Sequence, residues 1–324
     1  MKSHMHSTVR ILYTLLFLLL GSSLMTAIHA EEQAKQKAVL VTGASSGIGL
    51  RVTQDMAKAG YFVYAGARKE ADLKSLNEIE NVQAIRLDVN KWDEINAAVE
   101  TINAGGRGLH GIVNNAGVAV LEPLIEVDEG TLDFQFDVNI YGPYRITKAF
   151  APMIIESKGH ITTIGSIAGT LSGQFWGPYS MTKHAVEAYV DSLAEEMAKF
   201  DVGISIIEPG NYDSKIIASM LKRKERNKDK PSHYKKEFDD LIARYGADRS
   251  QFKDPGEVSE AIMHALFSDK PKHRYMVVPN KQEATWTITQ AMRRLVQQNH
   301  DQPHEFSRDE LIKIMDDMLK EVEQ

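Results

Sequence analysis

The chain has 324 residues, a formal net charge of -6 at pH 7 and 43% hydrophobic residues, which suffices to bury a full core in one large α/β domain or two small ones. The acidic balance argues against a nucleic-acid partner, and the absence of cysteine excludes disulfide bonds and thiolate metal sites. The 11 histidines show no metal-ligand spacing, so we expect no structural metal.

The N-terminal segment differs from the rest of the chain. Lys2 and Arg10 precede an apolar run that starts at Ile11, and small residues ending at Ala30 follow it. This order is typical of a secretory signal cleaved after Ala30, but the apolar stretch also approaches the length of a membrane anchor. We therefore expect residues 1–34 to be a signal peptide or an N-terminal membrane anchor, with the protein exported or membrane-associated rather than cytoplasmic.

From Lys37 onward, short apolar runs alternate with helical patterns. The expected strands are 38–41, 62–65, 82–89, 111–113, 160–164, 203–207 and 275–278. Continuous apolar strands joined by helices predict a parallel sheet covered on both faces, with right-handed connections. We expect residues 35–280 to form a single doubly wound Rossmann-like α/β domain with a seven-stranded parallel sheet.

A glycine-rich turn follows the first expected strand. Gly43, Gly47 and Gly49 lie between that strand and a helix that ends near Ala59. Backbone N–H groups in such a turn, with the positive end of the helix, can hold a pyrophosphate. The spacing G-x-x-x-G-x-G departs from the general G-x-G-x-x-G fingerprint of dinucleotide-binding proteins, and this departure is itself informative about the class of protein.

Tyr179 and Lys183 stand four positions apart where a long helical pattern begins. Residues at this spacing share a helix face, so the ammonium can favour the phenolate and lower the tyrosine pKa. Such a tyrosine would exchange protons near neutral pH. The alternative is a solvated surface pair without chemistry.

An ordered set of motifs carries a family resemblance. The motifs are T-G-A-S-S-G-I-G at 42–49, L-D-V at 87–89, N-N-A-G at 114–117, N-I-Y-G at 139–142, Ser166, Y-S-M-T-K at 179–183 and P-G at 209–210. The set resembles that of the short-chain dehydrogenase/reductase family, particularly its retinol, hydroxysteroid and 3-hydroxybutyrate dehydrogenases. The resemblance implies an NAD(P)-dependent oxidoreductase that transfers a hydride between nicotinamide and a carbonyl or secondary alcohol.

The resemblance implies four catalytic residues. Ser166 would hold a carbonyl oxygen, and Tyr179 would exchange a proton with it. Lys183 would lower the tyrosine pKa and hold the nicotinamide ribose. Asn139 would fix a water that links Lys183 to solvent, whereas the residue alone also fits a strand or helix cap.

The cofactor-binding set implied by the resemblance surrounds the same sheet edge. It comprises Gly43, Ser45, Ser46, Gly47, Ile48, Gly49, Arg68, Asp88, Val89, Asn115, Ala116, Gly117, Tyr179, Lys183, Pro209 and Gly210. Asp88 would meet the adenine ring, and Asn115 would support the sheet beside the cofactor. Because Arg68 follows the second strand where NAD-preferring relatives carry an acid, we expect NADP(H) to be favoured, with NAD(H) as the alternative. Ser46 weakens this preference, since NADP-preferring relatives often carry a basic residue there.

The substrate side is expected to be apolar. Phe175, Trp176 and Tyr212 are candidates to line a substrate pocket, with core packing as the alternative. Residues 215–254 interrupt the alternating pattern and are interpreted as a substrate lid region. The basic stretch 221–230 within it is interleaved with acids, which favours a solvated helical face.

Residues 281–324 form a C-terminal helical extension. Ser307 and Glu310 make a capping-box pattern before a helix whose apolar residues share one face. We expect this helix to pack on the core or on a partner subunit. Family analogy implies a homodimer or homotetramer acting on a small-molecule substrate.

A second function class remains open. A non-catalytic dinucleotide-binding or redox-sensing protein would keep the glycine turn without needing the four implied catalytic residues together. Because all four are present, the enzyme is favoured.

Overall fold

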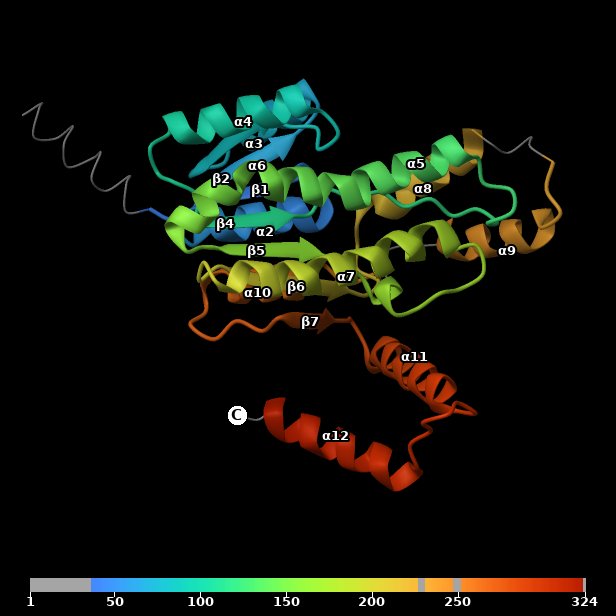
Figure 1. Cartoon of the computed structure of the whole chain (residues 1–324). Coiled ribbons are helices and arrows are strands. Elements are labelled where there is room, and N and C mark those ends of the chain that lie inside the picture. The colour runs from blue at the N-terminus through green and yellow to red at the C-terminus, as the bar shows by residue number, and fades with distance from the viewer. Residues whose placement is uncertain (1–35, 227–230, 247–251, 323–324) are drawn as a thin grey trace, which may run out of the picture.

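The computed structural model describes residues 36–226, 231–246 and 252–322 (Figure 1). The expected signal or anchor at 1–34 lies outside the described residues, as does part of the basic stretch at 221–230. Within the described ranges, no helix combines the length and apolar character needed to cross a membrane.

A seven-stranded parallel sheet forms the centre of the molecule, in the order β3-β2-β1-β4-β5-β6-β7. Its strands are β1 (Ala38–Thr42), β2 (Phe62–Ala67), β3 (Val82–Arg86), β4 (Gly111–Asn114), β5 (His160–Ile164), β6 (Gly203–Pro209) and β7 (Arg274–Val277). Strands β2 and β3 are added on one side of β1, and the strands from β4 onward are added on its other side. Doubly wound sheets bind their ligands at this switch point, between β1 and β4. The predicted doubly wound, Rossmann-like sheet is confirmed.

The third strand is shorter than predicted. We expected 82–89, but β3 ends at Arg86, after which the Leu87 amide still donates to the Ala67 carbonyl at 2.9 Å. The Asp88 carboxylate then accepts the Asn90 amide at 3.1 Å. Such a local side-chain bond offers the backbone a turn in place of the sheet ladder, so Asp88 leaves the strand.

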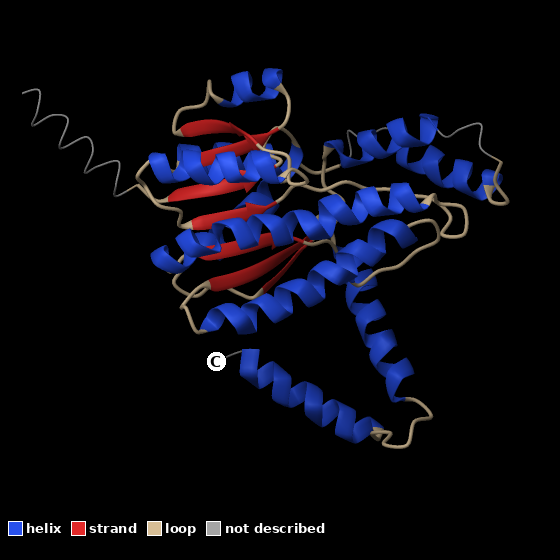
Figure 2. Cartoon of the chain, turned by 45° about the horizontal axis from the view of Figure 1, so that its top comes forward, coloured by secondary structure: helices blue, strands red, loops and turns tan. Residues whose placement is uncertain are grey.

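Helices cover both faces of the sheet (Figure 2). They are α2 (Gly47–Lys58), α3 (Glu70–Leu76), α4 (Trp92–Ala104), α5 (Glu129–Phe136), α6 (Gly142–Ser157), α7 (Gly177–Ala198), α8 (Lys215–Arg226), α9 (Lys235–Gly246), α10 (Gly256–Phe267), α11 (Lys281–Asn299) and α12 (Arg308–Val322). A π-helical turn, η1 (Asp137–Tyr141), precedes α6, and a 3₁₀ turn, η2 (Ile167–Gly169), follows β5.

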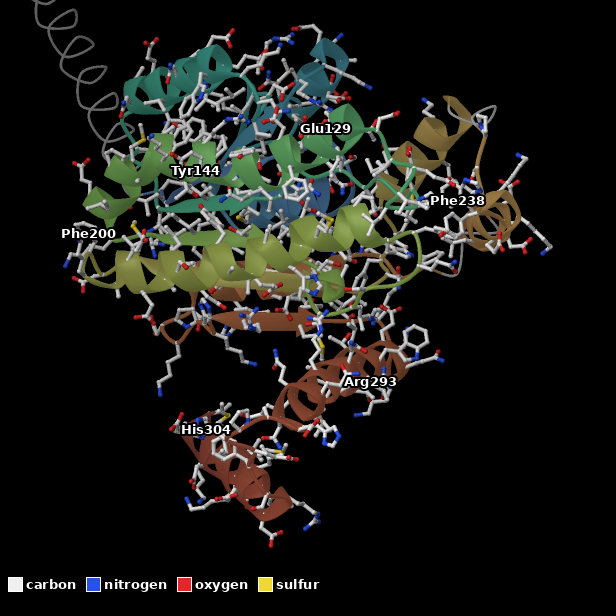
Figure 3. The ribbon with its side chains drawn as sticks, turned by 45° about the vertical axis from the view of Figure 1, so that its right-hand side comes forward. Glu129, Tyr144, Phe200, Phe238, Arg293 and His304 are labelled. Atoms are coloured by element: carbon white, nitrogen blue, oxygen red, sulfur yellow. The ribbon has the colours of Figure 1, made fainter. Side chains whose placement is uncertain are left out.

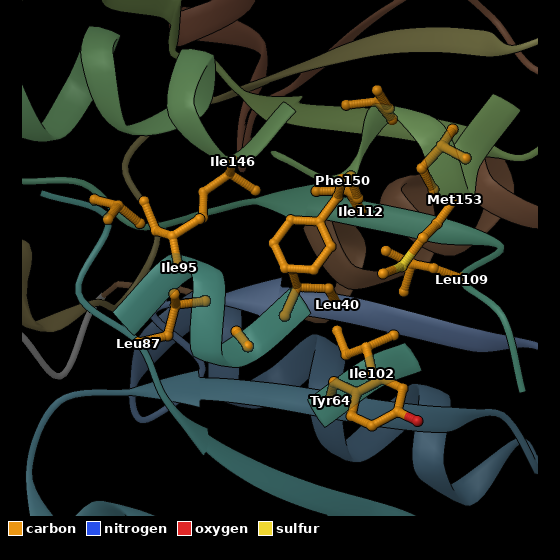
Figure 4. Packing of buried hydrophobic residues seen from close by; sticks show 14 of the residues in the cluster. Leu40, Tyr64, Leu87, Ile95, Ile102, Leu109, Ile112, Ile146, Phe150 and Met153 are labelled. Atoms are coloured by element: carbon orange, nitrogen blue, oxygen red, sulfur yellow. The ribbon is translucent and has the colours of Figure 1, made fainter. Parts of the chain in front are cut away.

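Two apolar cores hold these layers together. Leu40 points into the core under α4, α6 and α7, where Phe150 and Ile112 lie beside it (Figure 4). Its neighbour Val41 points the other way, into the core under α2 and α10. Alternate residues of a strand face opposite sides, so one buried strand serves both cores. Each fully buried side chain of this size contributes about 1.5–3 kcal/mol of transfer free energy.

Within the C-terminal extension, α11 contacts the body of the molecule, whereas α12 stands away from it (Figures 1 and 2). The predicted capping box is confirmed, because the Ser307 hydroxyl oxygen accepts the Glu310 amide at 3.4 Å and Glu310 Oε2 accepts the Ser307 amide at 2.8 Å. Of the two alternatives predicted for this helix, packing on the core is wrong, since no described residue of α12 is buried, and packing on a partner subunit stays a prediction. Its apolar residues include Met318 and Leu319, which are 59% and 56% exposed.

Candidate active site

The predicted site residues converge on the carboxyl edge of the central strands. The glycine turn follows β1, the segment at 115–117 follows β4, the Ser166 loop follows β5 and the Pro209–Gly210 turn ends β6. Tyr179 and Lys183 enter from the first turns of α7, which packs against the Ser166 loop and β6. Parallel strands end at one edge, so segments far apart in sequence meet there.

The glycine turn is held in shape by Asn115. Its Nδ2 donates to the carbonyls of Thr42 at 2.9 Å and Gly43 at 3.1 Å. Gly43 has a φ of +66°, a region that side chains with a Cβ rarely adopt. A Cβ on Gly49 would collide with the Gly43 carbonyl and with Asn115 Nδ2. The turn is therefore built around backbone groups, and Asn115 braces it from β4.

The start of α2 suits a phosphate group. Ser46 occupies the N-cap position, yet its side chain makes no capping hydrogen bond to the helix. The first N–H groups of a helix have no partner within it, and the helix dipole favours negative charge there. A dinucleotide pyrophosphate fits this donor set, with Gly47, Ile48 and Gly49 supplying the backbone of the first turn.

Arg68 and Asp88 meet just beyond the carboxyl ends of β2 and β3. Their side chains pair at 3.7 Å, with the Arg68 side chain 61% exposed and the Asp88 side chain 20% exposed. The pair joins the ends of β2 and β3. Because the guanidinium is exposed and only loosely paired, it retains donors for an anionic group.

Tyr179 is buried beside Ser166. Burial raises the pKa of Tyr179 to about 12, and a hydrogen bond with the Ser166 hydroxyl opposes that rise. Ser166 Oγ itself accepts the Ala168 amide at 3.1 Å, which orients the hydroxyl at the start of η2. The Ser166 hydroxyl thus lies close enough to the Tyr179 hydroxyl to affect its pKa.

Lys183 is also buried, and its ammonium points to the sheet. Nζ donates to the Ile164 carbonyl at 2.7 Å and lies 5.7 Å from the centre of the Tyr179 ring. Burial lowers the pKa of Lys183 to about 8, while the charge of Glu187 raises it. The predicted low pKa of Tyr179 is not found in this structure, because the effect of burial dominates and the Lys183 ammonium is bound to the Ile164 carbonyl. The action of the Lys183 charge on the tyrosine during the reaction stays a prediction.

Asn139 lies inside the π-helical turn η1. Its Oδ1 accepts the Val118 amide at 2.9 Å, and its Nδ2 donates to the Val118 carbonyl at 2.9 Å and to Thr182 Oγ1 at 3.0 Å. Thr182 Oγ1 in turn donates to the Tyr179 carbonyl at 2.8 Å. The cap alternative for Asn139 is wrong, because its side chain braces the loop after β4 against α7. Single π turns often occur at functional sites.

The aromatic candidates separate into two groups. Phe175 is buried with its ring 5.3 Å from that of Phe238 on α9, and Trp176 packs edge-on to Tyr179 at 5.8 Å. Tyr212 instead belongs to the core under α2 and α10, with its hydroxyl donating to Glu257 at 2.6 Å. The expectation that Tyr212 lines a substrate pocket is therefore wrong, because the chain after β6 turns its ring towards α10.

The predicted lid region lies over this aromatic group. Ile217 and Met220 of α8 are buried in one small cluster with Tyr179. Figure 3 shows Phe238 on α9 at the same end of the molecule. Arg293 lies on α11, and His304 lies in the turn between α11 and α12. Helices α8 and α9 thus place apolar side chains next to the proposed proton donor.

Sequence reasoning missed several residues that shape the site. Thr182 Oγ1 accepts a hydrogen bond from Asn139, and the charge of Glu187 raises the pKa of Lys183. Glu283 reaches back from α11 to accept the Asn211 amide at 2.8 Å, directly after Gly210. Only the spacing of Asn280 and Glu283, which matches a helix cap, hinted at the last of these.

Sequence comparison with known proteins identifies one family and several similar enzymes. The model of the family described as short chain dehydrogenase matches residues 37–225. The mitochondrial D-beta-hydroxybutyrate dehydrogenase of Rattus norvegicus is 32% identical over 268 residues, covering 75% of this chain and 77% of the relative. Retinol dehydrogenase 16 of Rattus norvegicus is 30% identical over 255 residues, covering 74% and 80%.

Solved structures of a ketoreductase and of a short-chain dehydrogenase resemble this fold. The actinorhodin polyketide ketoreductase with NADPH superimposes with a TM-score of 0.63 at 25% sequence identity, covering 76% of this chain and 96% of that chain. A short-chain dehydrogenase from Streptomyces avermitilis gives a TM-score of 0.68 at 26% identity, covering 81% and 94%.

Proposed function

The chain belongs to the short-chain dehydrogenase family and is an NAD(P)-dependent oxidoreductase, and from this premise we propose that it reduces a carbonyl group with Tyr179 as the proton donor. The observation that carries this proposal is the adjacency of the Ser166 and Tyr179 hydroxyls in a buried setting. Burial raises the pKa of Tyr179 to about 12, so the phenol holds its proton at neutral pH and can donate it to a carbonyl oxygen.

The proposed reaction balances without a metal. A reduced nicotinamide, held through its pyrophosphate at the glycine turn, would supply the hydride for the carbonyl carbon when bound. Ser166 donates a hydrogen bond to the carbonyl oxygen, and Tyr179 transfers its proton to that oxygen as it becomes an alcohol. Lys183 holds a positive charge below the tyrosine and stabilises the phenolate left behind. Solvent then returns a proton to Tyr179.

We propose NADP(H) as the preferred cofactor. Arg68 is exposed at the end of β2 and offers a guanidinium to a 2'-phosphate. Asp88 is the opposing feature, because its carboxylate pairs with the same guanidinium. The phosphate must therefore compete with Asp88 for Arg68, and NAD(H) stays the alternative.

The proposed substrate is a small apolar carbonyl compound. Trp176 lies edge-on to Tyr179, and Ile217 and Met220 of α8 pack in the same cluster. These side chains would face the part of a substrate next to its carbonyl and exclude water there. The lid role of residues 215–254 remains part of this proposal.

We also propose that the enzyme is a homo-oligomer. Family analogy supports a dimer or tetramer, and the exposed apolar face of α12 is compatible with a subunit contact. Export or membrane association through residues 1–34 stays a prediction from the sequence. Full-length protein found only in the cytosol after fractionation would contradict it.

The enzyme assignment is tested with Tyr179→Phe. Purified protein is screened against ketones and aldehydes of increasing apolar size while NADPH absorbance is followed. The variant should bind NADPH like the parent, because ring packing is kept, but turnover should fall by about a hundredfold or more. Turnover like that of the parent would show that Tyr179 is not the proton donor.

Tyr144→Phe is the matched control. Tyr144 and Lys148 repeat the four-residue spacing on α6, with Lys148 Nζ donating to the Tyr144 hydroxyl at 3.3 Å. This pair is on the surface, where Tyr144 is 44% exposed (Figure 3). Its loss should leave turnover unchanged. Tight NADPH binding by the parent without turnover of any carbonyl would instead favour the non-catalytic alternative.

A further inference from the structure

A buried acid lies one helical turn below Lys183. Glu187 follows Lys183 by four residues and Tyr179 by eight, so the three side chains share one face of α7. The Glu187 side chain is only 17% exposed. Its Oε1 is buried and has no hydrogen-bond partner within the described part of the chain. An unpartnered buried carboxylate oxygen costs free energy and calls for a reason.

The carboxylate lies beneath the Ser166 loop. A Cβ on Gly169 would be 2.5 Å from Glu187 Oε1, and a Cβ on Gly165 would be 3.2 Å from it. Glycines on both sides of Ser166 therefore make the space that the carboxylate fills. Glu187 touches the loop that carries Ser166 and belongs to the helix that carries the other two reacting side chains.

Charged groups of the two neighbouring strands face this acid. Arg274 of β7 contacts the carboxylates of both Glu187 and Glu208, the latter at 2.6 Å. Arg274 also pairs with Asp191 at 2.9 Å, and Asp191 pairs with His273 at 2.9 Å. One guanidinium thus serves three carboxylates, which leaves an excess of negative charge when all three are ionised.

This excess of negative charge favours the protonated form of Glu187. Burial, followed by the charge of Glu208, raises the pKa of Glu187 to about 8, against the opposing effect of Arg274. Burial lowers the pKa of Lys183 to about 8 as well, and the charge of Glu187 opposes that change. The two groups therefore titrate as a pair. The state with one proton removed is favoured as a Glu187 carboxylate beside a Lys183 ammonium, because opposite charges attract.

We propose that Glu187 is a positioning residue of the proposed reaction: from beneath the Ser166 loop, its carboxylate stabilises the Lys183 ammonium and extends proton supply through Tyr179 to higher pH. This inference rests on the proposed function for its kinetic consequence, but the charge coupling itself does not need turnover. Only protons move, between Glu187, Lys183 and solvent.

Glu187→Gln tests the proposal by the pH profile of kcat/KM for carbonyl reduction. Near pH 6 both proteins carry a neutral group at position 187 and a charged Lys183, so their rates should agree within about twofold. Above pH 8 the variant lacks the carboxylate, so the alkaline limb of its kcat/KM profile should move to lower pH by about one unit. At a given pH on that limb, its kcat/KM should be up to about tenfold lower than that of the parent. A uniform loss at every pH, or superimposable profiles, would overturn the proposal.

Two further variants fix the sign of the effect. Glu208→Gln removes the acid that raises the pKa of Glu187, so Glu187 ionises earlier and the alkaline limb should move to higher pH. Asp191→Asn removes another carboxylate from Arg274, but one that is 54% exposed, and should leave the limb in place. Shifts in the same direction for both glutamate variants would contradict the proposal. If Glu187→Gln fails to fold, Glu208→Gln carries the test alone.

A readout without activity separates this inference from the proposed function. Lysine labelled with ¹⁵N at Nζ reports the titration of Lys183 by NMR, with Lys183→Arg identifying the signal. Glu187→Gln should lower the pH at which this signal titrates, and an unchanged titration would overturn the inference. A shifted titration in a protein that reduces no carbonyl would support the coupling while removing the proposed function.

Discussion

The tyrosine–lysine pairs at 144/148 and 179/183 put one sequence pattern in two environments. In α6 the pair is solvent-exposed, with the Lys148 ammonium bound to the Tyr144 hydroxyl. In α7 the pair is buried, and the Lys183 ammonium turns to a backbone carbonyl. Spacing alone predicts a shared face, whereas burial and the adjacent Ser166 hydroxyl set the pKa of Tyr179.

Arg68→Ala should change cofactor preference. Only NADPH carries the extra phosphate, so the variant should lose roughly ten- to a hundredfold in NADPH affinity, corresponding to about 1.5–3 kcal/mol for a charge-assisted bond, with little change for NADH. Fluorescence titration with both cofactors measures this difference. Lys74→Ala, which removes an exposed cation from α3, is the control and should change neither affinity. Equal losses for the two cofactors would show that Arg68 does not contact a 2'-phosphate.

His160 should make the fold sensitive to acid. It is buried in β5, and burial lowers the pKa of His160 to about 4. The Ser205 hydroxyl donates to the Lys272 carbonyl, so it accepts from His160 Nε2 at 2.9 Å and fixes the neutral tautomer. The unfolded state binds the proton more readily between pH 6.5 and 4. Stability should therefore fall across that window as pH drops, by about 3 kcal/mol.

The test for His160 is denaturant unfolding of the parent and of His160→Gln at several pH values. Glutamine retains a donor near the Nε2 position but does not titrate. The variant should lose less stability than the parent between pH 6.5 and 4. Parallel losses would assign the acid sensitivity to other groups.

Among the elements, α11 has a larger part in the site than the sequence indicated. Its first turn is capped by Asn280, whose Oδ1 accepts the Glu283 amide at 2.9 Å. The Glu283 side chain is buried and accepts the Asn211 amide beside the Pro209–Gly210 turn. The extension thus begins as a brace for a proposed cofactor-binding turn, although its later residues leave the body.

Glu283→Ala should loosen that turn. A buried amide left without its acceptor costs about 1–3 kcal/mol, so the variant should be less stable and its KM for cofactor should rise by about fivefold or more. Glu310→Ala removes a similar cap from α12, far from the sheet edge, and should leave the cofactor KM unchanged. Thermal unfolding and cofactor kinetics of the two variants provide the comparison. An unchanged KM in Glu283→Ala would confine its role to folding.

For the whole molecule, the exposed apolar face of α12 predicts self-association. Met318, Leu319 and Val322 are 59%, 56% and 86% exposed, and contiguous apolar surface of this kind marks contact sites. Sedimentation velocity should show the parent as a dimer or larger, and Met318→Asp with Leu319→Asp should shift it towards smaller species. A Lys313→Asp change on the charged side of α12 is the control. A parent that sediments as a monomer at all concentrations would refute the prediction.

The sequence alone determined the parallel sheet and the order of strands and helices along the chain, because period, glycine spacing and helix caps are local properties. The set of segments expected at the carboxyl edge of the sheet followed from the family resemblance. Tertiary structure decided what depends on burial and on contacts between distant segments. It ended β3 at Arg86, turned Tyr212 towards α10 and raised rather than lowered the pKa of Tyr179. It also placed Glu187 under Ser166 and Glu283 against Asn211. Such contacts join residues whose separation along the chain carries no periodic signal, so only the folded chain reveals them.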